Sequence, residues 1–167
     1  RKKFAEGAPD LPLAFDQCTR TIIQEVDGLR NLVDEFSRFA RMPTPQRRPG
    51  DLNDVVQQVA KLYGGAPPGI TLRVSLDPAV PPVSLDPTHM KRALINLVDN
   101  AVTAIGEAPG EIAIATRSLA EAGRVQLEVA DTGPGFPPED RDRAFLPYYS
   151  TKRSSGGLGL AIVNRII

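Results

Sequence analysis

Three groups of residues in this sequence have the chemical character to bind phosphates, metal ions or flat heterocyclic rings. The first is Asn96-Leu97-Val98-Asp99-Asn100-Ala101, in which two asparagines stand four positions apart. On a helix, residues i and i+4 project from one face, so both amides would face the same partner. An amide oxygen suits Mg²⁺, and the amide NH₂ can donate to phosphate. The spacing also fits two polar positions on a solvated helix face, and this segment alone leaves that alternative open.

The second group is the loop Asp131-Thr132-Gly133-Pro134-Gly135-Phe136, which directly follows a predicted strand. The carboxylate of Asp131 can accept a hydrogen bond from an exocyclic amine. Gly133 and Gly135 let the backbone approach a flat ring or a phosphate closely. Because D-x-G also occurs in ordinary turns, the loop by itself is a weak signal.

The third group, Ser155-Gly156-Gly157-Leu158-Gly159-Leu160, precedes the last predicted helix. Free N–H groups at a helix N-terminus, in the field of the helix dipole, make a potential phosphate site. The glycine spacing matches neither a P-loop nor a dinucleotide fingerprint, and a flexible hinge is the alternative. The charged, proline-rich stretch 137–154 suits a lid over a nucleotide, and its Lys152 could reach the terminal phosphates.

The elements that must position these groups follow from periodicity and capping signals. Asp86-Pro87 is an N-cap followed by a first-position proline, which predicts a helix to about Ile105. Asp51 is predicted to be the N-cap of a second helix, which runs to about Tyr63. Another helix is predicted to start near Leu158. Alternating apolar residues predict a strand at 70–76 and a hairpin of strands around 112–114 and 125–129. The inward positions of the helix at 51–63 are predicted to be Val55, Val56, Val59 and Leu62.

The first quarter of the chain is predicted to be helical and to lack strands. Gly7, Pro9 and Pro12 should stop any helix, and 13–41 then forms one long helix with a heptad seam. The seam needs a partner helix, and residues 1–4 could be its tail in a helical hairpin; a single amphipathic helix lying on its own domain is the alternative. Three prolines in 43–50 predict a linker. The seam consists of Phe15, Thr19, Ile22, Val26, Leu29, Val33, Phe36 and Ala40.

Composition narrows the functional classes. Twenty basic and 20 acidic residues balance among 167, which gives no electrostatic case for nucleic acid or an anionic membrane as partner. The single cysteine, Cys18, cannot form an internal disulfide and favours a reducing cytoplasm. No apolar run is long enough to span a bilayer.

In this order and spacing, the motifs resemble the ATP-binding domain of sensor histidine kinases, in the gyrase, Hsp90, histidine kinase and MutL (GHKL) superfamily. The resemblance covers about residues 51–167: the N box lies at 96–101, the G1 box at 131–136, the F box at Phe145 and the G2 box at 157–160. Phe36-Ser37-Arg38-Phe39-Ala40-Arg41-Met42-Pro43 most resembles the nitrogen-regulation, NtrY-like kinases.

The resemblance implies a two-layer α/β sandwich of the Bergerat type over 51–167, with a mixed sheet and helices on one face. This domain would be incomplete at its C-terminus. Residues 1–42 would be the remnant of a dimerisation and phosphotransfer hairpin, with 13–41 as its second helix. The parent would be a homodimer through that helix and would pass phosphate to the receiver domain of a response regulator. This part would be cytoplasmic, with anchoring of the parent in the inner membrane left open.

The resemblance also implies roles for single residues. Asn100 would be the principal Mg²⁺ ligand, with Asn96 supporting the metal–phosphate site, and Asp131 would bind the adenine amine of ATP. Gly133 and Gly135 would shape the adenine pocket. The phosphates would be held by Lys152, Gly157, Leu158, Gly159 and Leu160.

The sequence departs from the family at the G2 box, where Ser155-Gly156 replaces the usual Gly-Thr, and it contains no H-E-x-x-N-P phosphoacceptor box. The only histidine, His89, should pack or cap in the first turn of its helix. Two other functions remain: a superfamily ATPase, which would carry Glu at the Asn96 position, and a degenerate nucleotide-binding dimerisation module.

Overall fold

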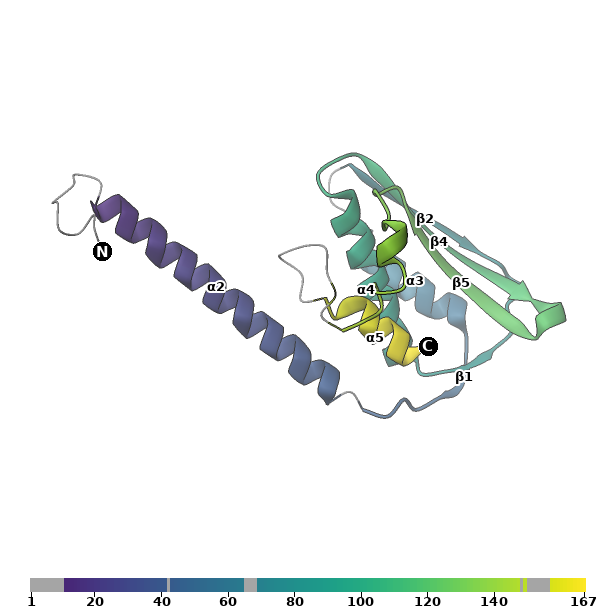
Figure 1. The fold of residues 1–167 in the computed structure, drawn as a ribbon. Coiled ribbons are helices and arrows are strands. Elements are labelled where there is room, and N and C mark those ends of the chain that lie inside the picture. The colour runs from purple at the N-terminus through teal and green to yellow at the C-terminus, as the bar shows by residue number, and fades with distance from the viewer. Residues whose placement is uncertain (1–10, 42, 65–68, 148, 150–156) are drawn as a thin grey trace. The chain divides into compact units, whose positions relative to one another are not determined.

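The computed structural model describes residues 11–41, 43–64, 69–147, 149 and 157–167. The chain divides into two compact units, one of Arg1–Met42 with Lys152–Gly156, the other of Pro43–Thr151 with Gly157–Ile167. The described part of the first unit is a single long helix, and the second unit is an α/β structure (Figure 1).

Helix α2 (Leu11–Ala40) makes up the described part of the first unit. It begins at Leu11, two residues before the predicted start at Leu13, because a proline in the first turn lacks only an N–H that would have no intrahelical partner. The proposed hairpin tail at 1–4 lies outside the described residues. The seam residue Thr19 donates its hydroxyl to the Phe15 carbonyl at 2.8 Å, which satisfies its polar group within the helix.

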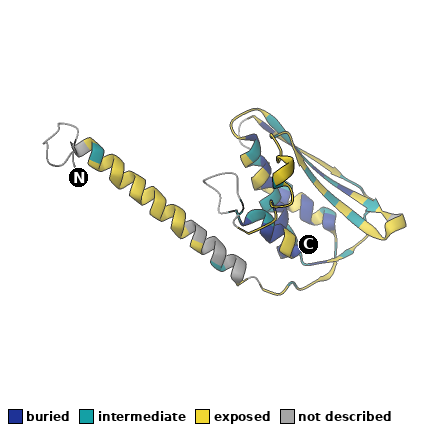
Figure 2. Ribbon diagram, viewed as in Figure 1, coloured by how far each residue is buried: buried dark blue, intermediate teal, exposed yellow. Residues whose placement is uncertain are grey.

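The described part of the first unit leaves the apolar seam of α2 uncovered. Phe15, Ile22 and Leu29 expose between 62 and 64% of their surface, and Figure 2 shows exposure along the described length of the helix. Among the described residues, no helix combines the length and apolar character needed to cross a bilayer.

The second unit contains a three-stranded mixed sheet in the order β2-β4-β5. Strand β2 (Ile70–Leu76) runs parallel to β4 (Gly110–Leu119), from the pair Ile70–Gly110 to the pair Leu76–Thr116. Strand β5 (Arg124–Asp131) returns antiparallel to β4. The hairpin turns through a short 3₁₀ helix, Ala120–Ala122, and Gly123, whose φ of +59° favours glycine.

Helices α3 (Leu52–Leu62), α4 (Pro87–Ile105) and α5 (Gly159–Ile166) lie on one side of this sheet (Figure 1). This arrangement confirms the predicted α/β fold with a mixed sheet and helices on one face. The prediction that Leu62 points inward is wrong, because α3 ends there and the next residue, Tyr63, packs against the core while Leu62 stays 69% exposed. The core consists of Val56, Val59, Ile70, Leu94, Val98, Ala101, Ile105, Ile112 and Ile114.

A second, two-stranded sheet was not predicted. Residues Arg48–Gly50 form β1, which pairs antiparallel with β3 (Val83–Leu85). The segment 43–50, predicted as a linker throughout, therefore ends in a strand. Pro49 is tolerated there because an edge strand does not need every N–H group for pairing. Strands of three residues are too short to show a periodicity in the sequence.

Candidate functional site

Helix α4 is the element around which the candidate site is built. Its N-cap is Asp86, whose Oδ1 accepts the N–H groups of Thr88 at 2.9 Å and His89 at 3.1 Å. The helix ends at Gly106, which has a φ of +70°. The core contacts fix the rotation of the helix, and they come from its buried residues Ala93, Leu94, Val98, Ala101 and Ile105.

The two asparagines of α4 differ in their surroundings. Asn96 is half-buried, and its Nδ2 is buried without a hydrogen-bond partner among the described residues. Asn100, one turn later, is exposed. A buried amide donor without an acceptor is costly in a chain by itself, so Asn96 is suited to an external acceptor such as phosphate.

The start of α5 lies against Asn100. A Cβ added at Gly159 would lie 3.4 Å from Nδ2 of Asn100 and 3.5 Å from its Oδ1, so the amide faces the backbone at this helix terminus. Leu158 is fully buried and anchors the turn into α5, while Leu160 is half-buried. Gly157 has a φ of +66°, which an L side chain rarely adopts. The alternation of glycine and leucine thus holds open backbone next to Asn100.

The loop after β5 lies against the same helix one turn beyond Asn100. A Cβ at Gly133 would lie 2.9 Å from Cβ of Ala104, so only glycine fits between the loop and α4. Asp131 is exposed, and its Oδ1 accepts the N–H of Gly133 at 2.8 Å. The described residues offer no hydrogen-bond partner for its other oxygen, which is available to an external donor. Gly135 follows with a φ of +69°.

The loop is also tied to the sheet beside it. The N–H of Thr132 donates to the carbonyl of Glu111 at 3.1 Å, and the Thr132 hydroxyl accepts the N–H of Glu111 at 3.0 Å. These two bonds hold the first residues after β5 alongside the start of β4. Helix α4 therefore contacts both glycine-rich motifs, one through Asn100 and Gly159 and the other through Ala104 and Gly133. Lys152 lies outside the described residues.

Part of the predicted lid is ordered by a local cluster. Pro138–Asp140 form a 3₁₀ turn, and the Tyr149 hydroxyl donates to Oδ1 of Asp140. The Arg143 guanidinium lies over the Tyr149 ring, 4.6 Å from its centroid. The bond to Asp140 raises the pKa of Tyr149 above its usual value. Phe145, the F-box residue, remains 47% exposed.

A contact that sequence reasoning missed joins α3 to the N box. The Tyr63 hydroxyl donates to Oδ1 of Asp99 at 2.7 Å. The pKa of Tyr63 is raised, mainly by partial burial and to a lesser extent by this hydrogen bond to the Asp99 carboxylate. Asp99 precedes Asn100, so Tyr63 fixes a charged neighbour of the candidate site. The partners are 36 positions apart and share no motif, and no local signal could have paired them.

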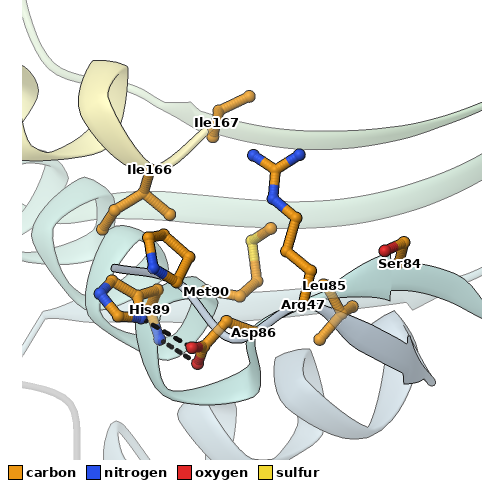
Figure 3. A pocket seen from close by; sticks show the side chains of 9 residues that line it. Arg47, Ser84, Leu85, Asp86, His89, Met90, Ile166 and Ile167 are labelled. Atoms are coloured by element: carbon orange, nitrogen blue, oxygen red, sulfur yellow. Dashed lines mark hydrogen bonds and ion pairs between the residues drawn. The ribbon is translucent and has the colours of Figure 1, made fainter. Parts of the chain in front are cut away.

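His89 packs in the first turn of α4, as predicted. It is 8% exposed, and its Nδ1 lies 3.0 Å from Oδ2 of Asp86 (Figure 3). Burial by itself would raise the pKa of Asp86, but hydrogen bonds from Gln46, His89 and Thr88 outweigh it and lower the pKa to about 2. The carboxylate is therefore charged at neutral pH and engaged by His89.

The site residues fit a magnesium nucleotide better than a metal ion alone. Among the described residues there is no group of three or more His, Cys, Asp or Glu side chains that could hold a metal. Mg²⁺ bound by amides would need further oxygen ligands, which nucleotide phosphates and water supply. The buried Nδ2 of Asn96 and the exposed amide of Asn100 provide one donor and one acceptor for such a complex.

The chain is similar to known sequences of one family. Residues 85–167 match the family described as histidine kinase-, DNA gyrase B-, and HSP90-like ATPase. The nitrogen regulation protein NtrY of Azorhizobium caulinodans is 35% identical over 171 aligned residues, which cover 100% of this chain and 22% of NtrY. The chain thus spans about a fifth of the length of that relative.

Solved structures give the same family. Full-length ShkA in complex with AMPPNP has a TM-score of 0.71 and 31% identity, with 90% of this chain and 33% of ShkA covered. ThkA in complex with the response regulator TrrA has a TM-score of 0.71 at 26% identity, with 96% of this chain and 45% of that one covered. The separate catalytic domain of ThkA has a TM-score of 0.65 and 32% identity over 73% of this chain and 80% of that domain. This chain therefore belongs to the sensor histidine kinases and contains their ATP-binding catalytic domain.

Proposed function

We propose that the second unit binds Mg-ATP and donates its γ-phosphoryl group to a histidine on another polypeptide segment. The observation that carries the proposal is the meeting of three motifs on one helix. Asn100 faces the start of α5, and Ala104 receives Gly133 of the loop that begins with Asp131. A binding site needs such convergence of segments distant in sequence, whereas a solvated helix face or an ordinary turn does not.

The roles of the residues follow from their chemistry. The free oxygen of Asp131 would accept the exocyclic amine of adenine, and the close fit of Gly133 would leave room for the flat ring. Asn100 would bind Mg²⁺ through its amide oxygen, and Asn96 would donate to a phosphate. The backbone N–H groups around Gly157, Leu158, Gly159 and Leu160 would also bind the phosphates. Gly135 would shape the adenine pocket, and Lys152 would reach the terminal phosphates from the lid.

Catalysis of phosphoryl transfer depends on positioning and on neutralising charge. When bound, Mg²⁺ would supply that neutralisation, while the amides and backbone N–H groups of this chain orient the phosphates. Asn96 also bears on the choice of acceptor. An amide has no basic lone pair with which to deprotonate water, so this position favours transfer to a histidine over ATP hydrolysis.

The phosphoacceptor must come from outside the second unit. The chain has one histidine, whose side chain is buried and whose Nδ1 faces the Asp86 carboxylate. His89 lies seven residues before Asn96, about 10 Å along the helix axis. A ring fixed on the helix that holds the nucleotide cannot swing in line with its γ-phosphate.

The partners follow from the relatives and from α2. The ThkA structure with TrrA supports a response regulator as the next acceptor. The exposed seam of α2 supports a homodimer through that helix, as in other bundles of amphipathic helices. Cys18 is an exposed, free cysteine, which fits a location in the reducing cytoplasm.

The kinase proposal is tested by incubating the chain with Mg²⁺ and γ-labelled ATP, alone and with a separate polypeptide that carries a family phosphoacceptor helix. We expect acid-labile label on the added helix and none on this chain. Asn100→Ala should abolish the transfer, and a helix with its histidine replaced should remain unlabelled. Label on this chain that disappears in His89→Ala would contradict the proposal.

Replacing Val33 by Glu should abolish self-association through α2. Val33 is 57% exposed on the seam, and a charge there would be buried in any helical dimer at a cost of several kcal/mol. Light scattering over a concentration series, with oxidative cross-linking at Cys18, measures the effect. Gln24→Glu is the matched control, because it adds the same charge at an exposed position off the seam. A strict monomer in the unsubstituted chain would contradict the dimer.

A further inference from the structure

The carboxylate of Asp86 holds two parts of the second unit at once. Its Oδ1 caps α4, and its Oδ2 accepts the backbone N–H of Gln46, 40 positions earlier, at 2.8 Å. The same Oδ2 lies 3.0 Å from Nδ1 of His89. We propose that Asp86 and His89 form a clasp that fastens the segment 43–47, the covalent route from α2, to the helix that carries Asn96 and Asn100.

The burial of His89 supports this assignment. An imidazole in the first turn of a helix can usually reach water, but His89 is only 8% exposed. Burying its polar ring is costly unless a partner compensates. The group that the structure places beside its buried Nδ1 is the Asp86 carboxylate, whose Oδ2 is 3.0 Å away but does not form a hydrogen bond of good geometry with it. Figure 3 shows His89 and Asp86 in a pocket together with Met90 and Ile166. Pro45 also lines this pocket. The pocket therefore lies among the segment, α4 and α5, and the clasp would join the first two of these elements.

Apolar packing does little to hold the segment. Thr44, Gln46 and Arg47 are exposed, and a cavity of about 120 Å³ remains between the segment and the ends of α4 and α5. The next residues, Arg48–Gly50, are fixed by their pairing with β3. The bond from Gln46 thus ties the chain just before the strand, and its loss would let 43–47 swing about Arg48.

The clasp has a mechanical consequence for α4. His89 and Asn96 lie on one continuous helix, so a pull on the segment acts on the same rigid element that positions the candidate site. Movement between α2 and the second unit would reach that helix through Asp86. This coupling does not depend on nucleotide binding, and it can be tested without a ligand.

The test is hydrogen exchange of single amides, measured by NMR on the whole 167-residue chain. Asn is as good an N-cap as Asp, but an Asn side chain has one oxygen and cannot cap α4 and also accept from Gln46. In Asp86→Asn we expect the Gln46 amide to exchange about tenfold faster, with the amides in the middle of α4 unchanged. Asp51→Asn is the matched control, because Asp51 caps α3 without contacting the segment, and it should leave Gln46 unchanged.

The variant His89→Phe distinguishes the contribution of the packed ring from that of its polar nitrogen. Phenylalanine keeps an aromatic ring in the pocket but cannot engage Oδ2 of Asp86, so exchange at Gln46 should again become faster, by a smaller factor. Unchanged exchange at Gln46 in both variants would overturn the clasp. So would a Gln46 amide that, in the unsubstituted chain, exchanges as fast as the exposed amide of Thr44.

Discussion

Replacing Gly133 by alanine should lower the affinity for Mg-ATP by about 10- to 100-fold. The added Cβ would lie 2.7 Å from Oδ1 of Asp131 and 2.9 Å from Cβ of Ala104, distances at which something must move. Overpacking of this kind costs about 1–3 kcal/mol, and each 1.4 kcal/mol is a factor of ten in affinity. The cost falls on the loop, because Ala104 is held by the packed helix α4. Isothermal titration calorimetry with Mg-ATP measures the loss.

Gly28→Ala is the control for this substitution. Nothing lies within 4 Å of a Cβ at Gly28, in the middle of α2, so the change should leave nucleotide affinity unaltered. Alanine also favours a helix over glycine by about 1 kcal/mol, and α2 should become more stable. If Gly133→Ala binds Mg-ATP as tightly as the unsubstituted chain, the loop does not form one wall of the site.

Asn100→Ala should weaken binding of Mg-ATP by about 10- to 100-fold, as expected for the loss of one ligand to a charged group. The same substitution should change binding of metal-free ATP much less, because Asn100 is proposed to act through the metal. Alanine is a strong helix former, and position 100 is exposed, so α4 should keep its fold. Calorimetric titrations with Mg²⁺ and with a chelator provide the two affinities.

The comparison of the two titrations decides what Asn100 does. An equal loss with and without Mg²⁺ would mean that the amide contacts the nucleotide directly, and no loss in either would remove Asn100 from the site. Asn164→Ala is the matched control, since Asn164 is an exposed asparagine on α5, five residues after Gly159. It should bind Mg-ATP normally.

The sequence predicted the elements that carry strong local signals. Asp51 and Asp86 cap α3 and α4 as expected, because a carboxylate before a helical pattern satisfies N–H groups within three residues. The alternating residues of β2 and the hairpin of β4 and β5 are also local patterns, and the structure places them as predicted. The motif residues that the structure describes lie on the expected elements for the same reason, and their roles in binding remain predictions.

The features that the sequence could not predict depend on contacts between distant residues. Strands β1 and β3 form only because Arg48–Gly50 meets Val83–Leu85, and neither segment has a periodicity of its own. Tyr63 reaches Asp99 across the α3–α4 packing, and Gln46 reaches Asp86 across 40 positions. The contact of Gly133 with Ala104, which brings the loop to the helix, is of the same kind. Such pairs emerge only when the core fixes the relative placement of the elements.

The measurement that tests the site most directly is the calorimetric affinity for Mg-ADP against Mg-GDP, with Asp131→Asn beside the unsubstituted chain. Adenine presents an amine where guanine presents a carbonyl oxygen. A carboxylate that accepts from the amine should reject guanine, and we expect Mg-ADP to bind at least about 100-fold more tightly. Asp131→Asn should narrow the difference, since its amide can donate to guanine. Equal affinity of the unsubstituted chain for the two nucleotides would contradict the assignment of this site to adenine.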